Sequence, residues 1–267
     1  MDQSSDVLVQ TNGPVISVTL TRPTKRNALT GSMVEELRRA TAQFETSDDL
    51  RVLLVKAEGA YFSAGADIHG ALFPEYKGSP SEFRRQYAKG AGSLHLLGDA
   101  WEAIEKPVVV VHQGPCLGGA LELSLCADFR IASDNAAYEL PEIAFGGLPG
   151  SGGISRLTRL VGPHWARWLV LAQERITAHE ALNIGMIHRV VAHADLDEAV
   201  AAFCTKLAAQ PKEAFAAGKC AIELTRDLDR HSARNVERLA ASSLVSGAEF
   251  SSLLEALRAR FRGGKGS

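Results

Sequence analysis

Several patterns that would assign a function at once are missing from this 267-residue sequence. Its four cysteines form no C-x-x-C pair and its eight histidines include no H-E-x-x-H motif, so no metal site is predicted. A formal net charge of −2 favours neither nucleic acid nor an anionic membrane as a bulk partner. Apolar runs are short: the four valines at 108–111 suit a buried strand and could not span a bilayer.

Glycine-rich stretches are present, but the known nucleotide and hydrolase motifs are not. "GPCLGG" does not match G-x-G-x-x-G, and "GGKGS" is followed by no helix, as a P-loop would be. "GSGG" around Ser151 is not a nucleophile elbow, because Pro149 stands where that motif has glycine. A Ser-His-Asp hydrolase is therefore unsupported.

The composition is that of an ordinary globular protein, with 46% hydrophobic and 22% charged residues. The first ten residues, "MDQSSDVLVQ", have neither the basic segment nor the apolar segment of a signal peptide. We therefore expect a cytoplasmic protein with free, mostly buried thiols and no cofactor of its own.

Strands and helices alternate over the first 195 residues, which predicts an α/β core. The clearest strands are expected at 6–10, 15–20, 51–57 and 107–114. Helices are expected at 31–45, 80–105 with a break near Gly98, and 177–185. Three further helices are expected at 195–209, 212–226 and 231–262. The predicted organisation is a core over residues 1–195 and a helical region over residues 196–267.

The segment "CLGGALELSLCADF" (116–129) places two glycines and a carboxylate at the start of a helix that follows a strand. A helix N-terminus carries unpaired N–H groups, and glycine lets a substrate oxygen approach them. Glu122, one turn beyond Gly118 and Gly119, would stand beside that oxygen. The alternative is that the glycines serve close packing and that Glu122 is a structural carboxylate.

Two other segments repeat this chemistry. "FSAGAD" (62–67) is a second turn of small residues after a strand. "LPE" (140–142) places Glu142 at the end of an apolar strand, and "GGLPGSGG" follows shortly after it. Two strand-end turns and two carboxylates in apolar surroundings form a coordinated pattern.

These motifs together resemble those of the enoyl-CoA hydratase/isomerase (crotonase) family, in the family's order and spacing. The matching segments are "RPTKRNAL", "FSAGADI", "CLGGALELSLCADFRIAS", "YELPEIAFGGLPGSGG", "LTRLVG" and "NIGMIHRVV". The resemblance implies an α/β spiral of β-β-α units (ClpP-like) with two stacked sheets and C-terminal helices. It also implies an acyl-CoA thioester as the ligand and a homotrimer or homohexamer. The helical region would serve oligomerisation and cap the pocket.

The resemblance also implies roles for individual residues. The N–H groups of Ala66 and Gly119 would form an oxyanion hole, with Glu122 as the base that activates water and Glu142 as the acid. The residues implied in contacts with substrate or CoA are Lys25, Arg26, Ala28, Ala64, Asp67, Ile68, Gly118 and Gly150. For Lys25 and Arg26, a pair of solvated surface cations is an equal alternative.

Members of the family that hydrate a double bond resemble this chain in having both glutamates, which predicts an enoyl-CoA hydratase. The first alternative is a Δ3-Δ2 enoyl-CoA isomerase, in which Glu142 alone would move the proton. Another crotonase-family acyl-CoA enzyme is possible within the same fold. A different class is a non-catalytic protein that binds acyl-CoA.

The chain departs from the family at two places. Leu140 stands where hydratases often have glutamine. In the tail segment "LVSGAEFSSLLEALRAR", Ser252–Leu253, Leu257 and Ala259 replace the "EG", the phenylalanine and the lysine that the family commonly has. These differences predict a specialised acyl group in place of a short straight chain.

Overall fold

The computed structural model describes residues 6–68, 78–90 and 92–263. It divides into two compact units, one ending at Ala208 and one beginning at Ala209. Helix α7 (Leu196–Ala208) belongs to the first unit, because it packs against strands of the larger sheet and buries Val200 and Cys204. The first unit thus continues past residue 195, where the sequence placed the end of the core.

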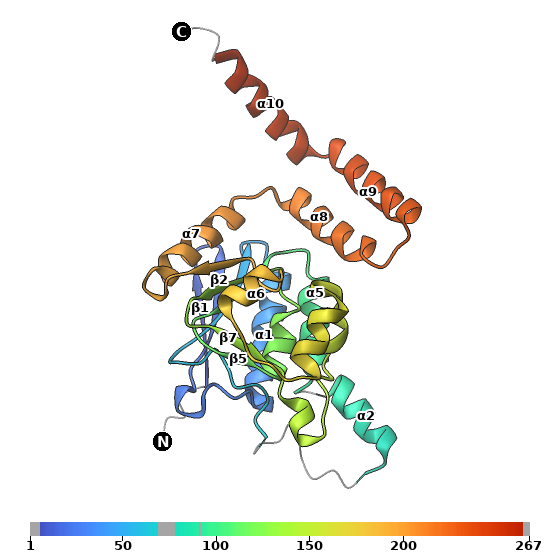
Figure 1. The fold of residues 1–267 in the computed structure, drawn as a ribbon. Helices are drawn as coiled ribbons and strands as arrows, with labels where there is room; N and C mark the ends of the chain where they lie inside the picture. The colour runs from blue at the N-terminus through green and yellow to red at the C-terminus, as the bar shows by residue number, and fades with distance from the viewer. Residues whose placement is uncertain (1–5, 69–77, 91, 264–267) are drawn as a thin grey trace. The chain divides into compact units, whose positions relative to one another are not determined.

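The first unit is built on two sheets (Figure 1). In the larger sheet the described strands run in the order β1 (Val7–Asn12), β2 (Val15–Leu20), β3 (Val52–Ala57), β4 (Val108–His112), β6 (Phe129–Ser133) and β9 (Arg189–Val191). The smaller sheet contains β5 (Cys116–Leu117), β7 (Ala137–Glu139) and β8 (Ile176–Thr177). β1 and β2 form the expected antiparallel hairpin, and the other strands of the larger sheet are parallel.

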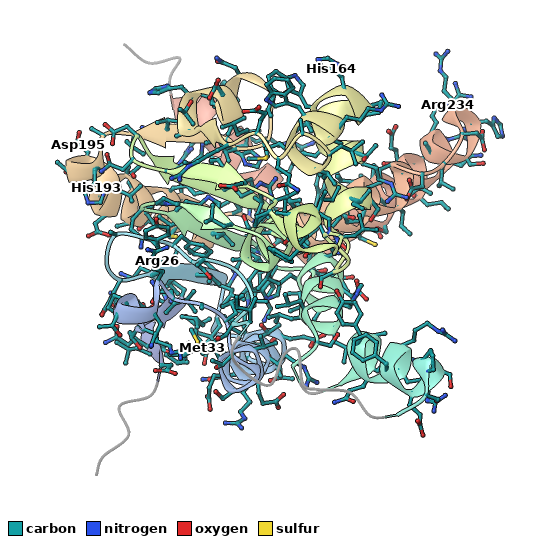
Figure 2. All side chains as sticks on the ribbon, turned by 60° about the horizontal axis from the view of Figure 1, so that its bottom comes forward. Arg26, Met33, His164, His193, Asp195 and Arg234 are labelled. Atoms are coloured by element: carbon teal, nitrogen blue, oxygen red, sulfur yellow. The ribbon has the colours of Figure 1, made fainter. Side chains whose placement is uncertain are left out.

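Helices cover the sheets and complete the core. They are α1 (Gly31–Thr46), α2 (Pro80–Lys89), α3 (Leu94–Ala103), α4 (Gly119–Ser124), α5 (Gly153–Val170) and α6 (Ala178–Asn183). Met33, which lies on α1 (Figure 2), is buried with Leu37 and Phe44 of the same helix. The four valines of β4 are buried too, as expected for a parallel strand covered on both faces.

The helical segment expected over 80–105 is broken into two helices, as expected, but the break does not lie at Gly98. Gly90 ends α2, and Ser93 begins α3 by accepting a hydrogen bond from the Leu96 N–H. Gly98 lies inside α3, where a Cβ would come within 2.6 Å of Cys126 Sγ. The lack of a side chain at position 98 therefore serves close packing against the core and does not break the helix.

Other local predictions are confirmed. Thr177 and Glu180 form the capping box of α6. Cys116, Cys126 and Cys204 are buried free thiols, and Cys220 is an exposed one.

The second unit is helical. It consists of α8 (Lys212–Thr225), α9 (Arg230–Val245) and α10 (Ala248–Gly263). The helix expected over 231–262 is interrupted at Ser246 and Gly247, since glycine is a poor helix former. Among the described helices, none has the length and apolarity needed to cross a bilayer.

Candidate active site

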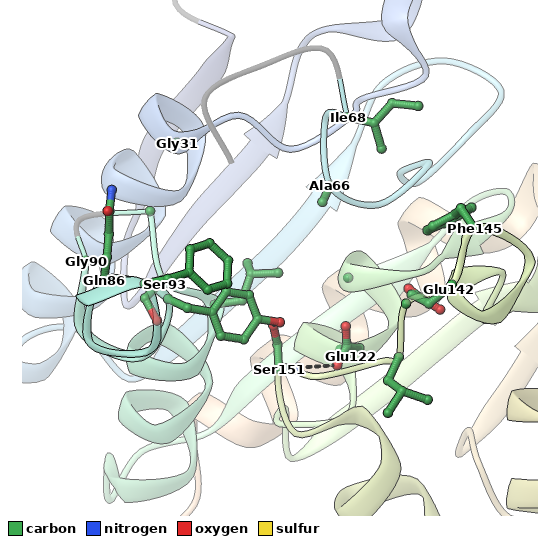
Figure 3. A pocket seen from close by; sticks show the side chains of 18 of the residues that line it. Gly31, Ala66, Ile68, Gln86, Gly90, Ser93, Glu122, Glu142, Phe145 and Ser151 are labelled. Atoms are coloured by element: carbon green, nitrogen blue, oxygen red, sulfur yellow. Dashed lines mark hydrogen bonds between the residues drawn. The ribbon is translucent and has the colours of Figure 1, made fainter. Parts of the chain in front are cut away.

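Five of the residues singled out in the sequence line one cavity of about 670 Å³ in the first unit (Figure 3). These residues are Ala66, Ile68, Gly119, Glu122 and Glu142. They come from three segments: the turn after β3, the start of α4 and the segment after β7. The fold thus brings together the small-residue turns and the carboxylates that are far apart in the chain.

The two glycines before Glu122 have different structural reasons. Gly118 has φ of +52°, which side chains rarely adopt, and its N–H donates to the Glu139 carbonyl over 3.0 Å. A Cβ at Gly118 would lie 2.8 Å from Glu142 Oε1, so this glycine also makes room for the second carboxylate. At Gly119, the first residue of α4, a Cβ would lie 3.0 Å from Leu94 Cδ1.

The N–H groups of Ala66 and Gly119 are both available to a ligand. Leu29 and Ala66 form an isolated parallel β-bridge, but its hydrogen bonds involve the neighbours of Ala66. The Leu29 N–H donates to the Gly65 carbonyl, and the Asp67 N–H donates to the Leu29 carbonyl. Gly119 opens a helix, where its N–H has no intrahelical acceptor. Among the described residues neither group has a hydrogen-bond acceptor. The two turns are adjacent, since a Cβ on Gly119 would lie 3.7 Å from the Ala66 nitrogen.

Asn27 holds the Ala66 turn in place and explains why "KRNAL" accompanies "FSAGAD". It is fully buried with φ of +51°, and its side-chain amide donates to the carbonyls of Glu58 and Tyr61 at 2.8 and 2.9 Å. The Ser63 hydroxyl donates to the Asn27 carbonyl over 2.7 Å and accepts the Gly65 N–H over 3.1 Å. Buried polar groups that are all paired in this way fix a loop to one conformation.

Glu122 is buried, with 4% of its surface exposed. Its Oε2 accepts hydrogen bonds from the backbone N–H groups of Ser151 at 2.6 Å and Gly153 at 3.0 Å. Burial raises the pKa of Glu122, the nearby Glu142 charge adds to this rise and the two N–H donors oppose it, and the resulting pKa is about 7. A Cβ on Gly153 would come within 2.7 Å of Glu122 Cγ, so glycine is required there.

Arg156 fixes the turn that holds Glu122. Its guanidinium forms a two-bond pair with Glu102 at 2.8 and 2.7 Å and contacts Asp99 at 2.9 Å. It also donates to the Ser151 carbonyl over 3.1 Å. A bidentate pair of this kind is geometrically specific, so α3 and α5 set the position of the N–H groups that bind Glu122.

The sequence predicts that Glu142 ends a strand, but it begins a 3-10 helix (Glu142–Phe145), three residues after β7 ends at Glu139. Pro141 lies between them and cannot donate to a strand ladder, which favours this break. The side chain is half-buried, and burial raises its pKa, as does the charge of Glu139. Its Oε2 is buried and has no hydrogen-bond partner among the described residues, so a ligand could bind it.

A buried polar chain lies beneath the site and was not singled out in the sequence. His112 Nδ1 contacts the Tyr138 hydroxyl at 3.0 Å, and its Nε2 contacts the Ser124 hydroxyl at 2.9 Å. Burial lowers the pKa of His112 to about 3, so the ring is neutral at ordinary pH. The chain joins β4, α4 and β7, and the last two are the elements next to the two glutamates.

The residues expected to contact CoA lie outside the described lining of the cavity, except for Ile68. Lys25 and Arg26 are exposed, and the guanidinium of Arg26, which is labelled in Figure 2, lies 5.2 Å from the centre of the Tyr61 ring. Ala64 donates its N–H to the Arg26 carbonyl over 2.9 Å.

The remaining members of this set border the site. Arg22 donates to the Ala28 carbonyl at 3.2 Å and to the Asp67 carboxylate at 2.7 Å, which supports the Ala66 turn. Gly118 directly precedes Gly119, the first residue of α4. Gly150 borders the cavity, but the N–H groups of this turn that bind Glu122 come from Ser151 and Gly153.

Sequence reasoning missed the residues that form the rest of the wall. These are chiefly Phe83, Gln86, Tyr87, Phe145 and Ser151. Three of them lie on α2, whose pattern was that of any amphipathic helix, so no signal in the sequence distinguished them. Across residues 6–68, 78–90 and 92–263, no cluster of His, Cys, Asp or Glu is placed to hold a metal ion.

Two unpaired backbone N–H donors beside one buried and one half-buried carboxyl group define a class of site that stabilises a developing oxyanion and moves protons next to it. Comparison with known proteins gives the family. A model of the enoyl-CoA hydratase/isomerase family matches residues 10–261, and the chain belongs to this family. The resemblance noted in the sequence is confirmed, as is the crotonase fold.

Curated relatives and solved structures agree. The chain is 33% identical over 223 residues to a short-chain-enoyl-CoA hydratase from Clostridium acetobutylicum, covering 82% of this chain and 81% of the relative. It is 34% identical over 209 residues to a carnitinyl-CoA dehydratase from Salmonella typhimurium, covering 78% and 76%. An enoyl-CoA hydratase structure from Bacillus anthracis superposes with a TM-score of 0.87 at 28% identity, covering 96% and 97%. A Thermobifida fusca structure in complex with CoA superposes with a TM-score of 0.81 at 30% identity, covering 91% and 93%.

Proposed function

We propose that this protein is an enoyl-CoA hydratase, which adds water reversibly across the double bond of a 2-enoyl-CoA thioester. The observation that carries the proposal is the placement of two carboxyl groups and two unpaired N–H groups around one cavity. The relatives named as hydratase and dehydratase support the same reaction. CoA enters as part of the substrate, and the mechanism calls for no other cofactor.

In the proposed mechanism, the thioester oxygen accepts hydrogen bonds from the N–H groups of Ala66 and Gly119. Glu122 removes a proton from water as the water oxygen bonds to the β-carbon, and the double-bond electrons move toward the thioester to give an enolate. The N–H groups stabilise this charge. Glu142 then gives its proton to the α-carbon, and the proton on Glu122 returns to Glu142 through solvent.

The local contacts support this division of roles. Oε2 of Glu122 is held by two N–H donors, which stabilise the ionised form that a base needs. Oε2 of Glu142 is buried and receives no donor from the described residues, which favours a protonated acid. An isomerase would need only Glu142, and it would leave a buried, charged Glu122 without a chemical purpose.

The experiment that tests the function is a panel of 2-enoyl-CoA thioesters with the product identified by mass. A hydratase adds the mass of one water. An isomerase gives an unchanged mass with a shifted double bond. A non-catalytic acyl-CoA-binding protein would bind the thioesters without any turnover.

The pH dependence of hydration should be bell-shaped. Glu122 must be ionised to act as a base, so kcat/KM should be low at acid pH, where this carboxyl group, whose pKa is raised to about 7, is protonated. Glu142 must be protonated, so activity should fall again at higher pH. The two apparent pKa values belong to the carboxyl pair, because neighbouring charges titrate together. The measurement should span about two pH units on either side of neutrality. A kcat/KM that stays constant over this range would contradict the proposal that the two glutamates act as base and acid.

We also propose that the helical second unit serves oligomerisation, as a trimer or hexamer. Its helices expose large apolar side chains, including Leu239, Leu253, Leu257 and Phe261. Leu239 and Phe261 are 71% and 72% exposed, and apolar surface of this kind commonly marks an interface. Sedimentation at micromolar concentration should show a trimer or a hexamer, and a monomer would contradict the proposal. Lys25 and Arg26 remain candidates for contact with the CoA nucleotide.

A further inference from the structure

We infer that the acyl group of the substrate carries an uncharged oxygen substituent, which hydrogen-bonds to a pair of hydroxyl groups formed by Tyr87 and Ser151. This inference rests on the proposed function, because it names the kind of acyl group that the same cavity accepts.

One O–H of this pair of hydroxyl groups has no acceptor among the described residues. Tyr87 Oη and Ser151 Oγ lie 3.3 Å apart, so one of them donates to the other. Two hydroxyls carry two protons, and a single bond between them leaves one O–H without an acceptor. Among the described residues neither hydroxyl has another hydrogen-bond partner. Both residues line the cavity, so the remaining O–H is available to a ligand there.

The pair lies next to the proposed chemistry but not in it. The Ser151 N–H donates to Glu122 Oε2, so the same residue contacts the proposed base through its backbone and carries one of the two hydroxyl groups on its side chain. Burial raises the pKa of Tyr87, and the charges of Glu122 and Glu142 raise it further. The phenol therefore keeps its proton and remains a donor over the whole working range of pH.

Gly150 allows the tyrosine to reach this position. A Cβ at Gly150 would lie 2.9 Å from the Tyr87 hydroxyl oxygen, which is too close for most real contacts. Gly150 has no positive φ that would require glycine for conformational reasons. Its lack of a side chain therefore fits the approach of the phenol to the Ser151 turn.

The surrounding wall is apolar and aromatic. The Tyr87 ring stacks on Phe83, with centroids 5.9 Å apart and planes inclined by 21°, and the edge of His95 packs against it at 5.2 Å. Leu94 and Leu148 also line the cavity. Such a wall fixes the phenol and accepts hydrocarbon or an aromatic ring around the substituent.

The charge of the cavity excludes an anionic substituent. Its described lining contains two carboxyl groups and no lysine, arginine or histidine. A carboxylate on the acyl group would be buried beside like charges with no cation in the described lining to offset them, which is costly. The chemistry therefore favours a neutral oxygen, as in a hydroxyl, ether or ketone, on a carbon beyond the β-carbon.

The competing explanation is that the spare O–H holds the reacting water for Glu122. The two explanations differ in how a Tyr87→Phe substitution acts on different substrates. A group that binds the acyl substituent matters only when the substituent is present. A group that holds the water matters equally for every substrate.

The experiment compares Tyr87→Phe with the parent on a plain 2-enoyl-CoA and on analogues that carry one hydroxyl at successive chain carbons. The parent should prefer at least one hydroxylated analogue over the plain chain, by about tenfold in kcat/KM. Tyr87→Phe should lower kcat/KM for that analogue about tenfold more than for the plain chain. An analogue of equal length that ends in a carboxylate should be a poor substrate for both enzymes.

Tyr61→Phe is the matched control, because it makes the same chemical change outside the cavity lining. It should leave the parent's preference between substrates unchanged, and thermal unfolding should show both variants folded. Equal losses on all substrates, or a parent without preference for any hydroxylated analogue, would overturn the inference while leaving the hydratase proposal intact. A parent that hydrates none of the thioesters would overturn both.

Discussion

Replacing Glu122 by glutamine should lower the rate of hydration by a factor of ~10²–10⁴, the usual contribution of a positioned acid or base. Glutamine keeps the length and the carbonyl oxygen of glutamate, so it can still accept the N–H groups of Ser151 and Gly153. It cannot take a proton from water. The measurement is kcat for hydration of a 2-enoyl-CoA, with circular dichroism to show that the variant is folded.

Glu142→Gln separates the two leading reactions. In a hydratase it should also impair hydration, because the α-carbon loses its proton donor. In an isomerase Glu142→Gln would be ruinous, while Glu122→Gln would be mild. Glu139→Gln is a suitable control, since it removes a neighbouring carboxylate that has no place in the mechanism. Its effect should fall far short of either. If Glu122→Gln leaves turnover within a few-fold of the parent, Glu122 is structural.

Gly119→Pro should nearly abolish turnover. Proline has no N–H, so the variant loses one of the two proposed oxyanion donors, worth ~3–4 kcal/mol of transition-state stabilisation, and its ring obstructs the approach of the thioester. The fold should tolerate the change, because Gly119 is the first residue of α4, where proline removes no intrahelical hydrogen bond. Single-turnover kinetics would measure the loss in the chemical step.

Gly119→Ala is the matched control for crowding at this position. It keeps the N–H and adds only a Cβ, which would meet Leu94 Cδ1 at 3.0 Å. Its loss should be clearly smaller than that of Gly119→Pro. A folded Gly119→Pro variant with near-normal kcat would show that this N–H does not bind the thioester oxygen.

The sequence could predict the centre of the site because each part of it is a local signal. Glycine or alanine directly after a strand, followed by a carboxylate among apolar residues, identifies a helix or turn whose N–H groups face a ligand. This signal indicates Glu122, Glu142 and the turns at 62–67 and 118–119, while the family resemblance points to Ala66 and Gly119 within those turns; all four residues line one cavity. Because the carboxyl ends of parallel strands lie at the same edge of a sheet, the turns that follow them are expected to lie close together.

The remainder of the site depends on contacts between distant segments, which leave no local signal. Tyr87 and Ser151 are 64 positions apart and meet only because α2 lies beside the turn before α5. The sequence predicts a helix break near Gly98 because it does not show the packing partner, Cys126, which lies on another segment. The apolar strand before Glu142 predicts that this residue ends the strand, but Pro141 breaks the ladder and Glu142 begins a 3-10 helix.

The most direct test of the two-carboxylate mechanism is isotope exchange into a 3-hydroxyacyl-CoA incubated with the parent protein in D₂O enriched in ¹⁸O. Reversible dehydration and rehydration should place ¹⁸O on the β-carbon and deuterium on the α-carbon together, as read by mass spectrometry. Glu122→Gln should slow both exchanges. Deuterium at the α-carbon without ¹⁸O at the β-carbon would contradict the account, because it would show a proton shuttle through Glu142 with no water activated by Glu122.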